Sequence, residues 1–166
     1  SSKKVKNLII VVSALGGVTD NLIKIASRAS EKNSTYKKLL KDIIDQHNEA
    51  IKKLVKPKRQ NSIFAEVEKK YDELNKSLQG IYLLGELSLR SLDYVMSFGE
   101  QLSAHIMSEA IKDQKIACTF VDSRSFIKTD DNFGSANISV QKTYELLSSH
   151  FQANPGLSIM GGFIGS

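Results

Sequence analysis

Residues 7–20 read NLIIVVSALGGVTD, and this stretch establishes the fold class. Residues 8–12 are apolar and mostly β-branched without polar alternation, which predicts a strand buried in a parallel sheet. Residues 13–17 follow as a Gly-containing turn, and Thr19 or Asp20 can cap a helix that begins there. A buried strand that leads directly into a helix is typical of an α/β domain.

The same alternation of strand and helix returns in the second half of the chain. Residues 116–121, IACTFV, predict a second buried strand. A helix near 138–151 and a third strand near 157–160 complete the pattern. Helices that alternate with strands favour parallel pairing, so we expect an α/β three-layer sandwich with a mostly parallel sheet.

Long amphipathic stretches separate the first two strands. Apolar residues recur every three or four positions in 36–55, and again from Phe64 to Tyr82 after Pro57. These stretches predict a long antiparallel helical pair at about 35–85, packed beside the sheet. A third helix is expected from about Ser91 to Lys112.

Composition excludes several classes of protein. A chain of 166 residues with 41% hydrophobic and 25% charged residues is typical of one globular domain, or part of one. Cys118 is the single cysteine, which fits a reducing cytoplasm. The apolar run 8–12 is far shorter than the roughly 20 residues of a membrane span. The basic residues that give the net charge of +5 are interleaved with 18 acidic residues, so we do not expect nucleic acid as a partner. With no apolar run of sufficient length, we do not expect a membrane as a partner either.

Gly16 and Gly17 lie between the first strand and the helix after it. A glycine turn there lets backbone N–H groups approach an anion, and the positive end of the helix dipole favours negative charge. The alternative is an ordinary tight turn. The spacing matches neither the Walker loop nor the dinucleotide-binding fingerprint.

Residues 97–105, SFGEQLSAH, form a second candidate site. Glu100 shares a helix face with small residues, and Gly99 inside a helix costs about 1 kcal/mol, which indicates a close approach of backbone or ligand. A carboxylate on a partly apolar face needs a cation. That cation is either a ligand or a lysine or arginine at a helix crossing.

A third group of polar residues follows the second strand, where open α/β sheets tend to bind ligands. Asp122 and Arg124 can pair across a turn, and we expect them to order the loop rather than to act in chemistry. His47 and His105 have no second histidine or cysteine at ligand spacing, so no metal site is predicted. Cys118 lies within a predicted strand and is expected in the core.

Four of these segments together resemble the amino-acid kinase superfamily and, within it, aspartate kinase. They are VVSALGGVTDNLI (11–23), SFGEQLSAHIMSEAI (97–111), FVDSRSFIKTDDNFGSA (120–136) and GGFIGS (161–166). Their order and their spread over nearly the whole chain make the resemblance specific. The LGGVTDNLI version, and the helical stretch that ends in QGIYLL, most resemble the kinase part of bifunctional aspartokinase/homoserine dehydrogenases.

The resemblance implies a reaction in which ATP, with Mg²⁺, phosphorylates the side-chain carboxylate of L-aspartate. This step leads toward threonine, methionine and lysine, and the enzyme is expected to be a cytoplasmic homo-oligomer. By resemblance, Glu100 receives the aspartate α-ammonium and Phe163 lines the pocket beside the substrate. Ser13 and Thr19 lie at the substrate and phosphate end, and Gly16 and Gly17 supply the close backbone approach.

The family pattern also extends beyond these residues. A Lys-Phe-Gly-Gly loop before the first motif, and a Gly-Arg-Gly-Gly-Ser-Asp segment after the last, are absent from the 166 residues. The sequence has no initiator methionine and stops after a Gly-rich run. We therefore expect residues 1–166 to be an internal, substrate-binding part of a kinase domain, without a complete catalytic set and inactive by itself.

Two other hypotheses remain at this level. One is another carboxylate kinase of the superfamily, such as a glutamate or acetylglutamate kinase. The other is a non-catalytic interaction module in which the helical stretch 36–85 binds a partner protein.

Overall fold

The computed structural model describes residues 7–162, whose three strands form one parallel sheet. The strands are β1 (Asn7–Val12), β2 (Cys118–Val121) and β3 (Gly156–Gly161), in the order β1-β3-β2. Asn7 pairs with Gly156 in the register of β1 with β3. The predicted parallel sheet is confirmed, with the last strand of the sequence at its centre.

Strand β1 has the predicted bounds but not the predicted burial. Leu8 and Val11 are 55% and 60% exposed, and Ile9 and Ile10 are also exposed. The reason is position: β1 is an edge strand of the described sheet, whereas a strand that is covered on both faces needs neighbours and helices around it. The expectation of a buried first strand is therefore wrong for residues 7–162.

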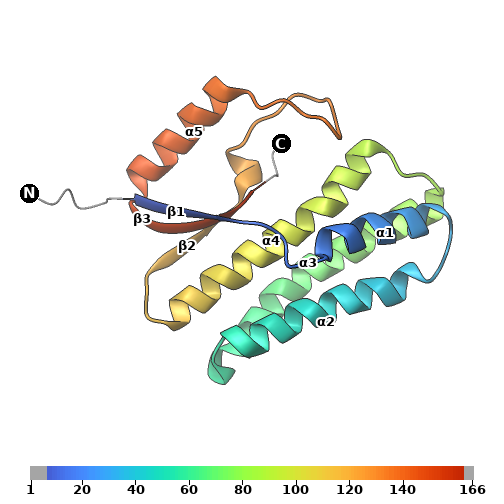
Figure 1. Ribbon diagram of the computed structural model, residues 1–166, viewed down its shortest axis with the longest axis horizontal. Helices are drawn as coiled ribbons and strands as arrows, with labels where there is room; N and C mark the ends of the chain where they lie inside the picture. Colours follow the sequence, from blue (N-terminus) through green and yellow to red (C-terminus); the bar gives the residue numbers. More distant parts are fainter. Residues whose placement is uncertain (1–6, 163–166) are drawn as a thin grey trace, which may run out of the picture.

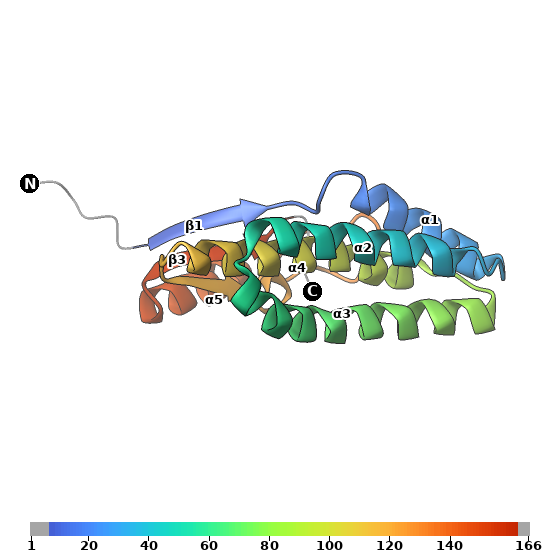
Figure 2. The same ribbon diagram turned by 90° about the horizontal axis from the view of Figure 1, so that it is seen from below.

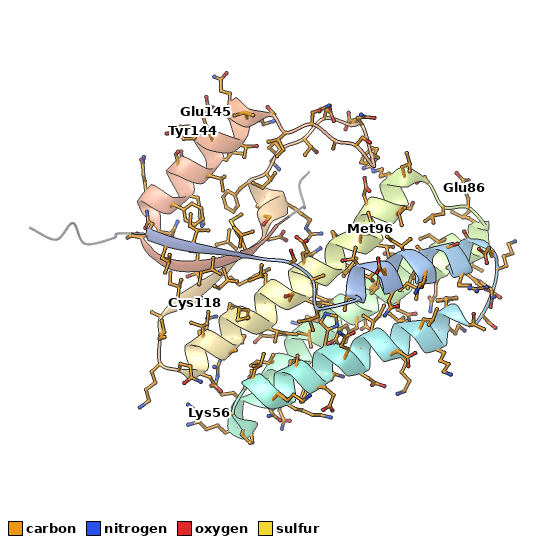
Figure 3. All side chains as sticks on the ribbon, viewed as in Figure 1. Lys56, Glu86, Met96, Cys118, Tyr144 and Glu145 are labelled. Carbon is orange, nitrogen blue, oxygen red and sulfur yellow. The ribbon has the colours of Figure 1, made fainter. Side chains whose placement is uncertain are left out.

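Helices cover the two faces of the sheet (Figure 1). The helix α4 (Leu89–Asp113) packs on one face, where Ala104 contacts Ile159 and Cys118. The helix α5 (Val140–Ala153) packs on the other, where Phe151 contacts Met160. Ile159 and Met160 are successive residues of β3, and successive strand residues point to opposite faces. Cys118 is in the core, as predicted, whereas Glu145 is exposed on the outer surface of α5 (Figure 3).

Three further helices gather beside α4: α1 (Val18–Ser30), α2 (Tyr36–Leu54) and α3 (Pro57–Leu84). Figure 2 shows α2 and α3 lying along each other and along α4. One apolar cluster joins all four helices through side chains such as Leu22, Ile43, Leu78 and Phe98. The two predicted amphipathic stretches are thus parts of a four-helix layer that shares its core with the rest of the protein.

A glycine sets how closely α4 approaches the chain after β1. A Cβ atom added to Gly99 would lie 2.9 Å from the Cβ of Ala14 and 3.2 Å from side-chain atoms of Val18 and Leu22. Real Cβ contacts are rarely that short, so a side chain at this position would push α4 away. The close approach predicted from a glycine inside a helix is confirmed, and it brings the first two candidate sites together.

The other end of α4 is held by charged side chains at the start of α3. Arg59 forms ion pairs with Glu109 and with Asp113, the latter at 2.9 Å. The ammonium of Lys56 donates to the Asp113 carbonyl oxygen at 2.6 Å. These bonds fix α4 lengthwise against α3. No helix in the described part of the chain combines the length and the apolar character needed to cross a membrane.

Candidate functional site

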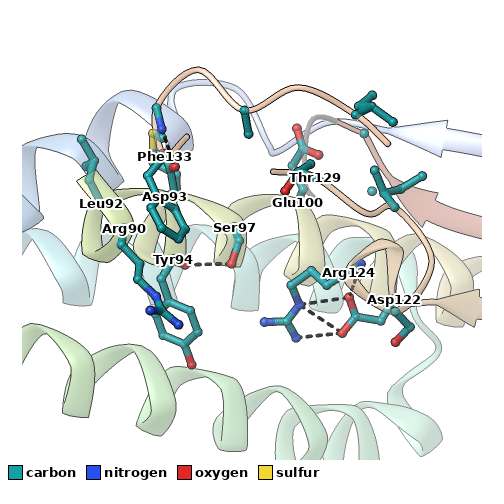
Figure 4. A pocket seen from close by; sticks show the side chains of 18 of the residues that line it. Arg90, Leu92, Asp93, Tyr94, Ser97, Glu100, Asp122, Arg124, Thr129 and Phe133 are labelled. Carbon is teal, nitrogen blue, oxygen red and sulfur yellow. Dashed lines mark hydrogen bonds and ion pairs between the residues drawn. The ribbon is translucent and has the colours of Figure 1, made fainter. Parts of the chain in front are cut away.

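An open cleft of about 2120 Å³ lies between α4, the segment after β2 and the carboxyl ends of the strands. Its wall includes Thr19 at the start of α1, Ser97 and Glu100 on α4, Arg124 after β2, and Gly162 after β3. Figure 4 shows Ser97 and Glu100 on α4, with the Asp122–Arg124 pair on a neighbouring part of the wall. Parallel sheets bind ligands at this end because loops from several strands converge there.

Glu100 is buried in the cleft wall without a cation. It is 9% exposed, and within residues 7–162 its Oε2 atom has no hydrogen-bond partner and its carboxylate no ion pair. Burial raises the pKa of Glu100 to about 7. A buried carboxylate is costly unless a positive group pairs with it. The lysine or arginine partner that the sequence left open is absent from the described residues, so the site suits a cationic ligand.

A second glutamate on the same helix shows the contrast. Glu109 is equally buried but accepts hydrogen bonds from Arg59 and, at 2.5 Å, from Lys112. Burial alone would raise its pKa, but these two cations outweigh that effect and lower the pKa below the usual value. The surroundings of Glu100 are thus specific to the cleft and not a general property of α4.

The carboxylate of Glu100 lies where β1 and β3 end. The Gly162 amide donates to the Val12 carbonyl oxygen at 2.9 Å, which holds the two strand ends together. A Cβ atom added to Gly162 would lie 3.8 Å from Oε2 of Glu100 and 3.2 Å from Val11. A larger residue at 162 would therefore narrow the cleft beside the carboxylate.

The glycine turn opens toward solvent at the amino end of α1. Gly17 has φ +77° and begins the helix, so its conformation favours glycine. Gly16 has no such requirement, and a Cβ atom there would meet nothing within 4 Å. Gln46 donates to the Gly16 carbonyl oxygen at 3.0 Å and steadies the turn. Gly16 is exposed, and a methyl group at this position would extend into open space, so packing among the described residues does not require glycine there.

The other predicted site residues have different positions. Thr19 lines the cleft from the first turn of α1. Ser13 follows β1, is exposed, and is not part of the cleft wall as described. Phe163 lies outside the described residues. The structure thus brings Thr19 and Glu100 to one cleft, with the glycine turn at the start of the same helix as Thr19.

The predicted pair of Asp122 and Arg124 is present. The guanidinium donates to the Asp122 carboxylate at 2.7 Å, and the Arg124 amide donates to it at 3.1 Å. Burial opposes ionisation of Asp122, but the hydrogen bonds from Arg124 outweigh it and lower the pKa of Asp122. The neighbouring Ser123 hydroxyl donates to the Gly161 carbonyl oxygen at 2.6 Å. These bonds order the segment after β2 and tie it to β3.

Sequence reasoning missed a chain of polar side chains that runs from the cleft wall to α3. Gln101 bonds both Ser97, four residues earlier on α4, and Lys70 on α3. The spacing of Ser97 and Gln101 on one helix could have indicated their contact. Lys70 is 31 residues from Gln101, so no local pattern identifies it.

The described residues offer little to a metal ion. No group of three or more His, Cys, Asp or Glu side chains within residues 7–162 is arranged to hold one. His47 is buried, and its Nδ1 atom lies 2.8 Å from the Ile43 carbonyl oxygen. Burial lowers the pKa of His47, although that hydrogen bond acts in the opposite direction.

Comparison with known proteins places these features in a family. The sequence profile of the amino acid kinase family matches residues 1–166. The chain is 30% identical over 167 residues to aspartokinase 1, chloroplastic, of Arabidopsis thaliana, covering 95% of this chain and 28% of that protein. It is 26% identical over 160 residues to the bifunctional aspartokinase/homoserine dehydrogenase 2, chloroplastic, of Zea mays, covering 95% and 17%.

A solved structure of similar fold is Escherichia coli aspartokinase III in complex with aspartate and ADP. The TM-score is 0.84 at 25% identity, and the match covers 95% of this chain and 34% of that one. The chain therefore spans about a third or less of the length of these relatives. The family profile, the relatives and the fold agree, and the chain belongs to the amino acid kinase family, with an aspartokinase-like domain.

Proposed function

We propose that the full-length protein is an aspartate kinase, in which residues 1–166 form the substrate-binding part of the kinase domain. The observation that carries the proposal is the Glu100 carboxylate, buried at the ends of β1 and β3 with no cation among the described residues. A free α-ammonium supplies the missing charge. Glutamate shares that group but is longer, whereas acetylglutamate lacks it, so the site favours an unacylated amino acid.

The proposed reaction transfers the γ-phosphoryl group of ATP to the side-chain carboxylate of L-aspartate. One carboxylate oxygen forms a bond to the γ-phosphorus, the bridging P–O bond breaks, and ADP leaves with that electron pair. Ionised Glu100 holds the α-ammonium and thereby directs the far end of the substrate. Catalysis of phosphoryl transfer is mostly positioning and charge stabilisation, and the contact with the ammonium contributes by binding the substrate in place.

We assign the end of the pocket that receives the phosphate groups to the start of α1. The backbone amides of Gly16 and Gly17 and the positive end of the helix dipole favour an anion there. Gly17, at the N-cap position of α1, places the turn at that end of the helix. Ser13 and Thr19 are proposed at this end and Phe163 beside the substrate, all by resemblance to the family.

ATP with Mg²⁺ remains the expected phosphoryl donor, and the complex of E. coli aspartokinase III with ADP supports nucleotide use. Residues 7–162 contain no group of three or more ligand-type side chains arranged to hold a metal ion. Mg²⁺ in kinases is bound largely by the substrate phosphates and water, so it is proposed to enter with ATP. The full-length protein is proposed to act in the biosynthesis of aspartate-derived amino acids.

The rival hypothesis of a helical interaction module needs apolar stripes that are free to bind. In the structure, Tyr36, Ile43, Leu74 and Leu78 are buried in the cluster that α2 and α3 share with α1 and α4. A partner protein would have to displace these helices. No feature of the described residues favours this hypothesis over a kinase.

The test is acyl-phosphate formation by the full-length protein, trapped with hydroxylamine, with aspartate, glutamate or acetylglutamate as acceptor. We expect aspartate to be preferred. Glu100→Gln should raise KM for aspartate at least tenfold and leave KM for ATP within about twofold, because an ionic hydrogen bond contributes roughly 1.5–3 kcal/mol. Glu145→Gln, on the outer surface of α5, is the control. Preference for another acceptor, or a silent Glu100→Gln, would refute the proposal.

A further inference from the structure

A chain of hydrogen bonds runs from α3 to the cleft wall beside Glu100. The Lys70 ammonium donates to Oε1 of Gln101 at 2.9 Å, and Nε2 of Gln101 donates to the Ser97 hydroxyl at 2.9 Å. The Ser97 hydroxyl donates in turn to the Tyr94 carbonyl oxygen at 2.7 Å. Gln101 is 2% exposed and Ser97 is 6% exposed, so water has little access to the bond between them, whereas the Lys70 side chain at the other end is 34% exposed.

The direction of each bond follows from the donors and acceptors present. A lysine ammonium has no acceptor, so the Gln101 carbonyl oxygen must face Lys70 and its amide hydrogens must face Ser97. Ser97 therefore accepts from Gln101 and gives its single hydrogen to Tyr94. A hydroxyl oxygen has two lone pairs, and the second of these remains available to another donor.

Helix geometry directs Ser97 toward both the cleft and α3. At 3.6 residues per turn, Glu100 lies roughly 60° to one side of Ser97 around the axis of α4, and Gln101 roughly 40° to the other. Ser97 thus stands between the stripe that carries Glu100 and the stripe that contacts α3. Both Ser97 and Glu100 line the cleft, as Figure 4 shows.

A second serine of α4, Ser108, shows which hydrogen bonds of Ser97 are common to serines in helices and which are not. Ser108 is fully buried and donates to the His105 carbonyl oxygen at 2.8 Å, the same three-residue bond that Ser97 makes. Among the described residues, Ser108 receives no side-chain donor comparable to Gln101, and it does not line the cleft. The additional chain to Lys70 therefore distinguishes Ser97.

We propose that Ser97 is a second acceptor for the substrate α-ammonium beside Glu100, and that Gln101 and Lys70 position it. The inference rests on the proposed function, because it assigns a further contact to the same substrate group. An ammonium has three N–H donors, and one carboxylate oxygen satisfies one of them. Ser97 takes another. An acylated amine has neither the charge nor the spare donors, so this pair of acceptors selects a free amino group.

The test uses the full-length protein and measures KM for aspartate, KM for ATP and kcat. Ser97→Ala should raise KM for aspartate roughly tenfold, as expected for loss of a hydrogen bond to a charged group. KM for ATP and kcat should stay within about twofold. Ser108→Ala is the matched control, since it removes the same kind of buried bond away from the cleft, and it should leave KM for aspartate unchanged.

The positioning residues have their own readout. Gln101→Leu and Lys70→Met should each raise KM for aspartate several-fold with little change in kcat. Lys70→Arg keeps a donor for the Gln101 carbonyl oxygen and should restore most of the affinity. A merely structural effect would alter thermal stability in all these variants without this pattern of loss and recovery. If Ser97→Ala does not fold, KM for aspartate in Gln101→Leu, Lys70→Met and Lys70→Arg tests the inference in its place.

Succinate, which is aspartate without its amine, separates the ammonium contact from general damage. Its inhibition constant should be unchanged in Ser97→Ala, because it has no ammonium for Ser97 to accept. Equal weakening of aspartate and succinate, or no change in KM for aspartate, would overturn the inference. If Glu100→Gln weakens aspartate and Ser97→Ala does not, the proposed function stands and this inference fails. If the wild type neither phosphorylates nor binds aspartate, both fail.

Discussion

Glu100 and Glu109 are glutamates of one helix, buried to a similar extent, that differ in their partners. Arg59 and Lys112 neutralise Glu109, whereas Glu100 has no cation within residues 7–162. Their carboxylates should therefore affect stability in opposite directions. Glu100 should destabilise the free protein at neutral pH, because its buried negative charge is not neutralised. Such a cost is typical of a binding site that is formed before its ligand, which here would supply the positive charge.

The first prediction concerns the pH dependence of stability. The pKa of Glu100 is about 7 in the folded protein against an ordinary 4.5. The folded state thus holds this proton more tightly, and ionisation costs stability as pH rises from 4.5 to 7, by on the order of 2–3 kcal/mol. Glu100→Gln removes this cost. In urea unfolding it should be more stable than the wild type at pH 8 and equal to it at pH 4.5.

The control for this prediction is Glu109→Gln, whose sign is opposite. The lowered pKa of Glu109 means that its charge stabilises the fold above its ordinary pKa, and that this contribution is lost as pH falls through the lowered value. Glu109→Gln should therefore lose stability at pH 8. A Glu100→Gln variant without any gain at pH 8 would show that this carboxylate already has a partner or water.

The second prediction compares two glycines inside helices. Gly99→Ala places a methyl group against Ala14, so it should cost about 1–3 kcal/mol by overpacking. Gly80→Ala in α3 meets nothing within 4 Å and should gain up to about 1 kcal/mol from the higher helix propensity of alanine. Thermal unfolding measures both. Similar effects at the two positions would contradict the tight crossing of α4 with α1.

The third prediction separates the two glycines of the turn after β1. Gly17→Ala forces a left-handed conformation on a residue with a side chain and should cost roughly 1–2 kcal/mol of stability. Gly16→Ala should leave the melting temperature unchanged, because its Cβ atom has open space. In the full-length protein, Gly16→Ala should raise KM for ATP without lowering the melting temperature, because its methyl group would occupy the space proposed for phosphate. A loss of stability without a change in KM would refute that use of the turn.

At the scale of elements, α4 joins the sheet to the helical layer. Ser88 precedes it as the N-cap, with its hydroxyl accepting from the Ser91 amide at 3.1 Å, and the helix ends beside the Arg59 ion pairs. Between these ends it packs on β3 through Ala104 and on α1 through Gly99. The position of Glu100 therefore depends on contacts along the whole helix, and a lengthwise shift of α4 would move the carboxylate out of the cleft wall.

The fourth prediction tests the lengthwise anchor. Arg59→Met leaves the buried Glu109 carboxylate with a single cation and should reduce the free energy of unfolding by roughly 1–3 kcal/mol. Lys41→Met is the control, since the exposed Lys41–Asp45 pair at 2.5 Å is screened by water and its loss should have no measurable effect. Urea denaturation at neutral pH distinguishes the two. Equal effects would mean that the α3–α4 ion pairs contribute no more than a surface pair.

At the scale of the whole molecule, the described sheet has an open apolar edge. All four residues from Leu8 to Val11 are exposed on β1, and alternate residues face opposite sides. An exposed apolar edge strand can pair with another chain through its free backbone groups and its side chains. Such an edge can lead the 166-residue chain, taken by itself, to self-associate through β1.

The fifth prediction follows from that edge. We expect the 166-residue chain to self-associate in sedimentation velocity at micromolar concentration, and Leu8→Lys with Val11→Lys to shift it toward the monomer. Leu83→Lys is the control, because Leu83 is even more exposed, at 75%, but lies near the end of α3. If the control dissociates the chain and the β1 variant does not, the contact is elsewhere.

The elements and the order of the motifs could be predicted from the sequence alone. A β-branched run defined the bounds of β1, and three-four periodicity identified α2, α3 and α4, because these signals arise between residues close along the chain. The four family motifs, and the inward acid at Glu100, were visible for the same reason. The tight approach at Gly99 could also be predicted, since glycine inside a helix needs a cause.

Which segments meet could be learned only from the folded chain. Four features depend on residues far apart in the sequence: the strand order β1-β3-β2, the exposure of β1, the lack of a cation beside Glu100 among residues 7–162, and the bond from Lys70 to Gln101. Local patterns report what a residue prefers, whereas partners arise from the packing of whole elements. A buried carboxylate looks the same in sequence whether a lysine or a ligand neutralises it, and the surrounding fold decides between them.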